Sequence, residues 1–422
     1  MYSSIDKCRI CGNENLDLLL DLGEQALTGV FPRRMDETVP GGPLQLVRCV
    51  VNDDDAACGL VQLKHSYDGT YMYGQNYGYR SGLNRSMVEH LGDLAARIKS
   101  RISLGAGDSI LDIGSNDSTL LRFMDAPGVS LTGMDPSGAK FREFYPSHVQ
   151  LVPDFFSASR FSRETGGKKA KIVTSIAMFY DLESPVDFMR QIAEILHPEG
   201  LWVFEQSYLP LMLERNAYDT ICHEHIEYYA FRQVEWMASR AGLKIIDVEL
   251  NDTNGGSFAV TAALADSPHR PDESALAALR AREAALGLAG SAIYDAFRTR
   301  VFDHRKKLVN WLDTQMNSRR LVLGYGASTK GNVLLQFCGI TPREIPYIAE
   351  VNPDKFGYYT PGTKIPIISE EEARAMNPSS FLVLPWHFRE NIIAREKDFL
   401  SRGGRLVFPL PELEEIDGCG TR

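Results

Sequence analysis

The run CHEHIEYY, residues 222–229, holds the densest group of side chains able to do acid–base chemistry in this sequence. It contains His223, Glu224 and His225, with Tyr228 close behind. An imidazole that titrates near neutrality can remove a proton at pH 7, and a neighbouring carboxylate can orient it. The two histidines lie two residues apart, which does not fit the one-face zinc pair of H-E-x-x-H. We therefore expect a general base here, with a metal site completed by distant ligands or a structural hydrogen-bonded cluster as the alternatives.

Four cysteines near the N-terminus have the spacing of a metal site. Cys8 and Cys11 form a C-x-x-C pair, and Cys49 and Cys58 form a second, wider pair. Two thiolates on each of two tight turns can complete a tetrahedral site of four sulfur ligands. A segment of about sixty residues buries too little core to be stable alone, and a metal supplies the missing stability. The pattern therefore predicts structural Zn²⁺ in preference to free thiols or a redox C-x-x-C.

Residues 109–121, SILDIGSNDSTLL, predict a strand, a tight turn and a helix. A small-residue turn at the carboxyl end of a parallel strand is where open α/β sheets bind ligands. Asp112, Gly114 and Asn116 lie at this turn, and Asp135 ends the next apolar run, where an acid suits a ribose diol. The turn contains one glycine, so the full dinucleotide fingerprint is absent.

A second turn of this kind follows at residues 319–335, RRLVLGYGASTKGNVLL, with Glu350 at the end of the next apolar run. It is not a P-loop, because Lys330 follows Thr329 and the G-K-S/T ending is missing. The free amides of a helix N-terminus suit a diphosphate. Ser328 and Lys330 are therefore candidate contacts for a phosphorylated substrate.

The elements around the two turns indicate an α/β protein. Further apolar runs after each turn continue an alternation of strands and helices that is typical of parallel sheets. Residues 275–312 contain no proline and predict one or two long helices between the two units. Five tyrosines crowd residues 67–79, where they suit either sugar and nucleotide contacts or packing between modules.

The composition excludes several classes of function. The chain has 422 residues, 44% of them hydrophobic and 24% charged, which is ordinary for a soluble globular protein. Its net charge of −10 does not favour binding to nucleic acid or to an anionic membrane. No apolar run is long enough to span a bilayer and no signal-peptide pattern opens the chain, so a cytoplasmic enzyme with a small-molecule substrate is expected. The oligomeric state is left open.

The order of these motifs resembles the sugar C-methyltransferases over essentially the whole chain. The four-cysteine module is followed by a turn similar to the class I methyltransferase loop D-x-G-x-N/G-x-G, with Ser118 in place of the last glycine. Y-D-T-I-x-H-E-H at residues 218–225 and N-G-G-S at residues 254–257 complete the series. Members of this family act on nucleotide-linked keto-deoxysugars with S-adenosylmethionine (SAM) as methyl donor.

The resemblance implies three domains. They are a zinc-binding module over residues 1–66, a class I methyltransferase (Rossmann-like) domain over residues 67–265, and a helical linker with a second Rossmann-like α/β domain over residues 266–422. The expected contacts to SAM are Asp112, Gly114, Ser115, Asn116, Asp135, Asp154, Phe155 and Ala177.

The resemblance also implies roles at the reacting centre. His225 would remove the proton from the carbon next to a 4-ketone, at the 3-position of the sugar, and Glu224 would hold His225 or help to position the substrate. Tyr79, His223 and Tyr180 are candidate donors to the enolate oxygen. Cys222 and Asp181 stand where an aromatic or imidazole donor is expected, so this donor is left open. The expected substrate contacts are Tyr77, Tyr180, Tyr228, Ser328, Lys330, Trp386 and His387.

Three other functions compete with this interpretation. An O- or N-methyltransferase would use His225 to deprotonate a hydroxyl or an amine. A non-catalytic, zinc-containing module would only bind nucleotides, and an oxidoreductase would bind NAD through residues 324–331. The sugar, the nucleotide base and the stereochemistry of methylation are not predicted.

Overall fold

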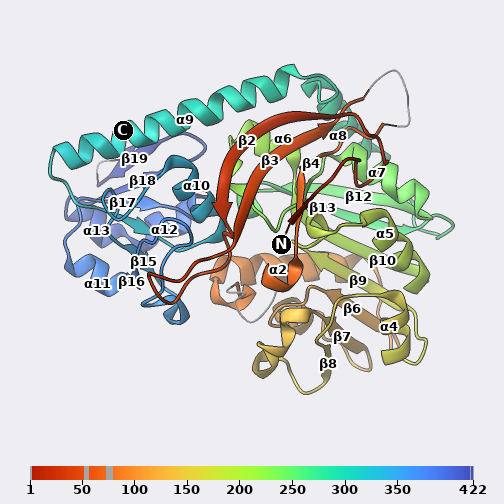
Figure 1. Cartoon of the computed structure of the whole chain (residues 1–422). Coiled ribbons are helices and arrows are strands. Elements are labelled where there is room, and N and C mark those ends of the chain that lie inside the picture. Colours follow the sequence, from red (N-terminus) through yellow and green to blue (C-terminus); the bar gives the residue numbers. More distant parts are fainter. Residues whose placement is uncertain (1, 52–56, 73–78, 419, 422) are drawn as a thin grey trace.

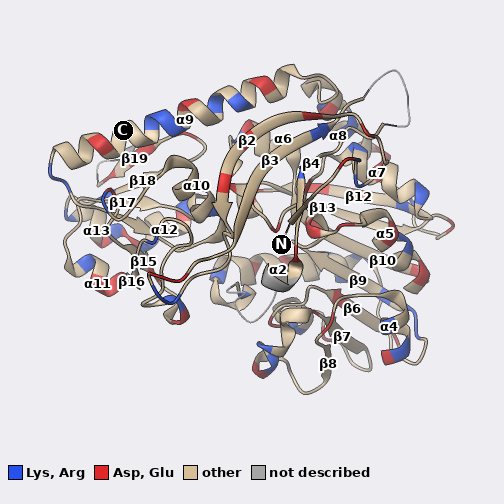
Figure 2. Ribbon diagram, in the orientation of Figure 1, with Lys and Arg blue, Asp and Glu red and all other residues tan. Residues whose placement is uncertain are grey.

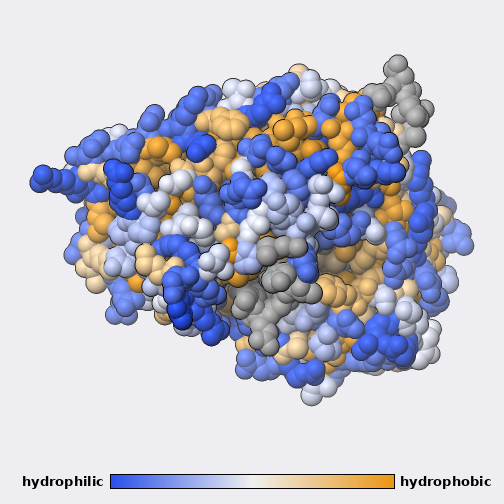
Figure 3. All heavy atoms as spheres, viewed as in Figure 1, coloured by the Kyte–Doolittle hydropathy of each residue, from blue (hydrophilic) through white to orange (hydrophobic). Residues whose placement is uncertain are grey.

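The computed structural model describes residues 2–51, 57–72, 79–418 and 420–421, in which two seven-stranded sheets and a four-stranded sheet form the framework (Figure 1). Tyr77 lies outside these residues. Within the described part of the chain, no helix is both long enough and apolar enough to cross a membrane. On the face seen in Figure 3, hydrophilic residues predominate and apolar residues form scattered patches.

The first seven-stranded sheet is built around the turn after residue 113. Its order is β12 (Leu243–Asn251), β13 (Ser257–Leu264), β10 (Leu196–Ser207), β9 (Ala170–Ile176), β6 (Ser109–Ile113), β7 (Ser130–Met134) and β8 (Val149–Val152). The strands from β10 to β8 run parallel, whereas β13 is antiparallel to both β10 and β12. Every residue of β6 is buried because helices cover both faces of the sheet.

Helices on the two faces of this sheet complete its core. On one face α2 (Arg85–Arg101) and α3 (Thr119–Phe123) pack together, and α2 buries residues at helical spacing from Met87 to Ile98. On the other face lie α4 (Ala158–Glu164), α5 (Pro185–Ile195) and α7 (Phe231–Arg240). The predicted α/β fold is confirmed by this arrangement.

The second seven-stranded sheet forms the C-terminal domain. Its order is β16 (Ile367–Ser369), β15 (Ile348–Glu350), β14 (Val322–Tyr325), β17 (Ser380–Val383), β18 (Arg405–Phe408), β19 (Glu414–Asp417) and β20 (Gly420–Thr421). Helices α10 (Thr329–Cys338), α11 (Glu370–Ala375), α12 (Arg389–Arg395) and α13 (Lys397–Ser401) flank it.

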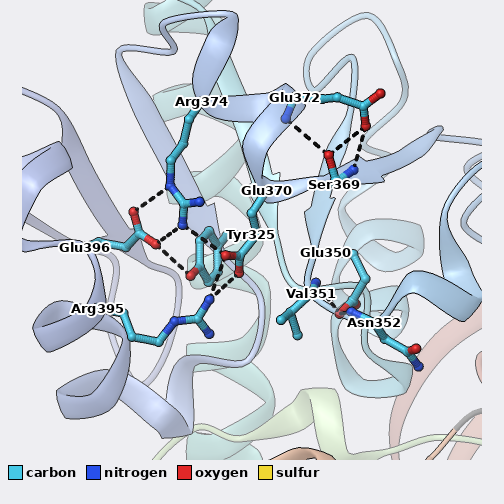
Figure 4. A network of polar contacts seen from close by, with 10 residues as sticks. All are labelled: Tyr325, Glu350, Val351, Asn352, Ser369, Glu370, Glu372, Arg374, Arg395 and Glu396. Atoms are coloured by element: carbon cyan, nitrogen blue, oxygen red, sulfur yellow. Dashed lines mark hydrogen bonds and ion pairs between the residues drawn. The ribbon is translucent and has the colours of Figure 1, made fainter.

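A polar network fastens helices to this second sheet. The buried carboxylate of Glu396 accepts a hydrogen bond from the Tyr325 hydroxyl at 2.9 Å and pairs with Arg374 (Figure 4). Glu370 in α11 pairs with both Arg374 and Arg395. Because Arg374 lies beside it, the Glu396 carboxylate can be buried without being an isolated ion.

Two helices connect the sheets, as the sequence predicts. They are α8 (Glu273–Leu286) and α9 (Ala292–Asn317), separated by a turn in which Gly287 has a φ of +67°. The long helix α9 crosses one edge of the molecule and carries charged residues along its length (Figure 2). Its buried side chains follow each other at three- and four-residue steps, which is the stripe of a helix packed on one side.

The four-stranded sheet shows that the N-terminal module is not an independent unit. Its order is β11 (Glu227–Tyr228), β4 (Val61–Leu63), β3 (Gly41–Cys49) and β2 (Leu16–Ala26), so its first strand comes from the methyltransferase part of the chain. The long strands β2 and β3 arc towards α10, where the Ala26 amide donates to Gln336 Oε1 at 2.8 Å (Figure 1). A module with little core of its own thus shares the cores of both larger units.

Candidate active site

The turn after β6 adopts the tight geometry that its spacing predicts. Gly114 has a φ of +73°, and a Cβ atom there would lie 3.2 Å from Met178 Cγ. Asn116 and Ser118 also take left-handed backbone, with φ of +47° and +66°. Asparagine tolerates this region better than most residues, and Ser118 adopts here the conformation for which the related loops use glycine.

Two buried carboxylates stand beneath this turn. Asp135 Oδ2 accepts the Asn116 amide at 2.8 Å, and its Oδ1 accepts the Ser137 amide at 2.6 Å. Asp112 accepts a hydrogen bond from the Thr174 hydroxyl at 2.7 Å, and burial raises the pKa of Asp112 to about 7. Carboxylate oxygens have two lone pairs each, so Asp135 can hold the turn and still accept from a ribose hydroxyl.

The neighbouring strand ends offer surfaces that fit an adenosine ligand. Phe155, just after β8, is a large apolar side chain that is 59% exposed, and Asp154 beside it is also exposed. After β9, Ala177 has a φ of +54° and its amide donates to the Glu205 carbonyl at 2.7 Å. A tight amide-lined turn, an exposed aromatic ring and a carboxylate at one sheet edge suit the adenosine part of SAM.

Ser115 has a different environment from the rest of this group. Its hydroxyl lies 2.8 Å from the Tyr145 hydroxyl, which in turn donates to the Asn116 carbonyl at 2.9 Å. The two hydroxyls therefore stabilise the backbone of the turn at Asn116. Tyr145 is a residue that the sequence analysis missed, since no motif surrounds it.

The segment around Tyr79 lies directly on the turn. The Ser81 amide donates to Asn116 Oδ1 at 2.9 Å, and Asn116 Nδ2 donates to the Tyr79 carbonyl at 3.2 Å. The Gly82 amide donates to Asp117 Oδ2 at 3.0 Å. The Asn116 contact holds Tyr79 beside the turn after β6, where Tyr79 is 47% exposed.

His225 is held in one tautomer by the backbone. Its Nδ1 lies 3.0 Å from the Thr220 carbonyl oxygen, which can only accept, so Nδ1 carries the proton. In the neutral imidazole, Nε2 is then the basic nitrogen. The Tyr180 ring packs against the imidazole with centroids 4.3 Å apart, and the Tyr228 hydroxyl lies 3.5 Å from the same Thr220 carbonyl.

Burial and the positive charge of Lys330 together lower the pKa of His225 to about 3. The imidazole is therefore neutral at physiological pH and has a lone pair with which to accept a proton. The same shift makes this imidazole a weaker base than free histidine, so its fixed orientation is what favours proton transfer.

Glu224 and His223 point towards the N-terminal module. Glu224 Oε2 accepts from the Thr28 hydroxyl at 3.4 Å, and its pKa is raised by burial. The partner that orients His225 through Nδ1 is Thr220, the role for which the sequence suggested Glu224. His223 is fully buried, with Nε2 3.4 Å from the Gly42 carbonyl and its ring edge-on to Tyr67 at 4.6 Å.

The N-G-G-S turn brings the C-terminal domain to this centre. Asn254 and Gly255 have φ of +55° and +92°, which leaves the Asn254 carbonyl free to accept from Lys330 Nζ at 2.6 Å. A Cβ atom at Gly255 would lie 3.1 Å from the Trp386 ring. The close approach of Trp386 thus explains Gly255, whereas a Cβ atom at Gly256 would lie 2.7 Å from Leu211 Cβ.

Trp386 and His387 follow β17 at the same boundary. Trp386 Nε1 donates to the buried Asp219 carboxylate at 2.8 Å, which ties the C-terminal domain to the Y-D-T-I segment. Burial and the charge of Lys330 hold the pKa of His387 well below its usual range. Ser328 caps α10 by accepting the Gly331 amide at 3.0 Å. Asp219 and Thr220 lie in the Y-D-T-I motif, but nothing in their types assigned them these roles.

The four cysteines meet as predicted. Their Sγ atoms all lie within 4.8 Å of one another. Among the described residues, these four cysteines form the cluster of possible metal ligands. Four thiolates at this separation fit a tetrahedral zinc site. The Cys58 carbonyl accepts from Gln233 Nε2 of α7 at 2.8 Å, so the cluster is anchored on the methyltransferase domain.

Comparisons with known proteins match the chain from end to end. Family models match a zinc binding domain over residues 8–73, a methyltransferase domain over residues 87–248 and a C-methyltransferase C-terminal domain over residues 252–411. The C-methyltransferase NovU of Streptomyces niveus is 31% identical over 424 residues, covering 99% of this chain and 98% of NovU.

Similar solved structures cover less of the chain. The CcbJ methyltransferase from Streptomyces caelestis covers 42% of this chain and 90% of its own, at 15% identity and a TM-score of 0.33. The plantazolicin methyltransferase BpumL in complex with SAH covers 41% of this chain and 82% of its own, at 13% identity and a TM-score of 0.34.

Proposed function

This chain belongs to the C-methyltransferase family and is a SAM-dependent enzyme with a structural zinc site. On this basis we propose that its substrate is a nucleotide-linked 4-keto-deoxysugar. The carbon that it methylates is the one next to the ketone, with the 3-position expected. Membership of a C-methyltransferase family argues against the alternatives of an O- or N-methyltransferase, a non-catalytic binding module and an NAD-dependent oxidoreductase.

The observation that carries the proposal is the state of His225. A hydrogen next to a ketone is acidic because its carbanion delocalises as an enolate. The Thr220 carbonyl holds the proton of His225 on Nδ1, so Nε2 is the nitrogen that can accept the proton from the sugar carbon. When bound, SAM supplies the electrophilic methyl group that the carbanion takes.

The enolate oxygen needs a positive group or a hydrogen-bond donor nearby. Lys330 lies close enough for its charge to lower the pKa of His225, and its Nζ is held at the Asn254 carbonyl. We assign the stabilisation of the enolate to this ammonium group. Of the donors expected from the sequence, Tyr180 packs on His225 and stays an alternative, whereas His223 is buried against the Gly42 carbonyl. Glu224 and Tyr228 stay candidates for positioning the substrate, and Tyr79 stays a second candidate donor to the enolate oxygen.

Incubation of the protein with SAM and a panel of dTDP-, GDP- and CDP-linked 4-keto sugars tests the substrate class. We expect a methyl mass gain for at least one member and, without SAM, exchange of its α-hydrogen for deuterium in D2O. Methyl transfer without any such exchange would contradict an enolate route. No mass gain with any member would contradict the substrate class.

Replacing Lys330 by methionine should move the acid limb of kcat/KM to higher pH by about one unit. His225 must be neutral to accept a proton, and Lys330 lowers its pKa. Without that charge the pKa of His225 rises, so activity is lost at a less acidic pH. The pH profile of Lys306→Met, which removes an exposed lysine of α9, is the control for net charge. An unchanged acid limb in Lys330→Met would contradict the proximity of the two groups.

A further inference from the structure

A cavity of about 310 Å³ lies beside the site, between the methyltransferase and C-terminal domains. Its walls come from the start of α2, the turn η6 (Thr253–Gly255) and the segment from η8 (Trp386–Phe388) into α12. Among the residues that line it are Met87, His90, Asn254, His387 and Arg389. Asn254 also holds Lys330, so the cavity adjoins the centre around His225. Its volume is in the range of small-molecule pockets.

A carboxylate–imidazole pair forms part of this cavity wall. His90 Nε2 lies 2.6 Å from Glu205 Oε1, and Glu205 Oε2 accepts from Asn251 Nδ2 at 2.8 Å. The Glu205 side chain is 2% exposed, whereas that of His90 is 17% exposed and borders the cavity. A carboxylate accepts only, so Nε2 of His90 carries a proton and Nδ1 is the nitrogen left for another partner. Thr253 Oγ1, also at the cavity, lies 3.3 Å from that Nδ1.

The pair is connected to the cofactor site through the backbone. The Glu205 carbonyl accepts the amide of Ala177, which lies at the end of β9 where the methyl donor is expected. The pair therefore lies at the strand end beside the expected methyl-donor site.

The charged side chains at the cavity differ in how far they are buried. The two acids at its rim, Asp252 and Glu390, have side chains that are 88% and 89% exposed, so both carboxylates are in solvent. The side chains of His90 and Arg389 are only 17% and 29% exposed. Arg389 pairs with Glu414 at 2.8 Å, so His90 is the group left to contact a ligand, through its second ring nitrogen. Met87 and Phe388 add apolar surface, against which a nucleobase can pack.

We propose that the Glu205–His90 pair is a positioning dyad that holds a phosphate of the substrate in this cavity. The inference rests on the nucleotide-linked substrate proposed above. With one ring N–H on Glu205, the imidazolium form of His90 directs its second N–H to a phosphate oxygen. Glu205 fixes the ring, and the bound phosphate sets the distance between the sugar and His225.

Calorimetric titration with dTDP, UDP, GDP and CDP, and with the corresponding nucleosides, tests this role. We expect His90→Gln to weaken the binding of the preferred nucleoside diphosphate by about tenfold or more, because a charge-assisted hydrogen bond is lost. Binding of the nucleoside and of SAM should change less than about twofold. In turnover, KM should rise more than kcat falls, which a merely structural role would not produce.

Two further variants keep the outcome decisive. Glu205→Gln should weaken the diphosphate in the same selective way, since it removes the carboxylate that orients His90. His148→Gln removes a histidine from an exposed pair with Asp125 and should bind every ligand as the wild type does. Equal binding of the diphosphate by the wild type, His90→Gln and Glu205→Gln would overturn the dyad alone. Failure of the wild type to bind any of the four diphosphates would overturn the nucleotide-linked substrate as well.

Discussion

Replacing His225 by asparagine should lower kcat by about 10²- to 10⁴-fold while SAM binds as tightly as before. The asparagine amide can keep the hydrogen bond to the Thr220 carbonyl, so the local backbone is retained. It has no basic nitrogen, and the proton next to the ketone then has no acceptor. Single-turnover methyl transfer and calorimetric titration of SAM measure the two effects.

Deuterium exchange separates the base from the methyl transfer itself. His225→Asn should lose exchange of the substrate α-hydrogen to the same extent as it loses methylation, because both need the same proton removal. His269→Asn, at a half-buried histidine whose ring bonds to the Glu199 carbonyl at 2.9 Å, should leave both rates unchanged. Methylation that survives in His225→Asn would show that another group is the base.

Replacing Cys58 by serine should release the zinc, lower the free energy of unfolding by at least about 3 kcal/mol and abolish most activity. The reason lies in the sheet that the cluster stabilises. Strand β4 follows Cys58, and its Leu63 amide donates to the Ile226 carbonyl at 2.8 Å, directly after His225. Glu227 pairs with Gln62 in the same ladder. Loss of the metal therefore loosens the segment that positions the base.

Metal analysis, thermal denaturation and turnover together check this prediction. Cys338→Ser is the matched control, because Cys338 is a buried cysteine of α10 outside the cluster; its stability should change by about 1 kcal/mol or less. A chelator strong enough to remove zinc should reproduce the Cys58→Ser phenotype in the wild type. Full activity in a zinc-free protein would contradict the link between the metal and His225.

Much of the α/β framework was predictable because its signals are local. The apolar run of residues 109–113 and the single glycine after it specify a buried strand and a turn without help from distant residues. The spacing of the four cysteines likewise predicts their site, because zinc binds four thiolates that can be arranged tetrahedrally around it. Helices α8 and α9 follow from composition and the absence of proline.

The partners within the site were not predictable in the same way. Glu224 is adjacent to His225 in sequence, yet neighbouring residues in a turn can point in opposite directions, and its carboxylate faces Thr28. The group that fixes His225 is a main-chain carbonyl, which every residue has and no motif marks. His90 and Glu205 are 115 residues apart and meet only because α2 packs on the sheet that contains β10.

The sequence by itself determined the chemistry of the parts: a thiolate cluster, an acid-lined turn for an adenosine ligand, an imidazole next to a carboxylate, and a second turn that carries a lysine. Each depends on residue types and short spacing, which local physics constrains. Only the tertiary structure decided how these parts act on one another. It placed β11 in the sheet of the zinc module and Lys330 at the Asn254 carbonyl. These long-range contacts arise because the small N-terminal module and the two larger units bury apolar surface against each other, and that packing sets which side chains face His225.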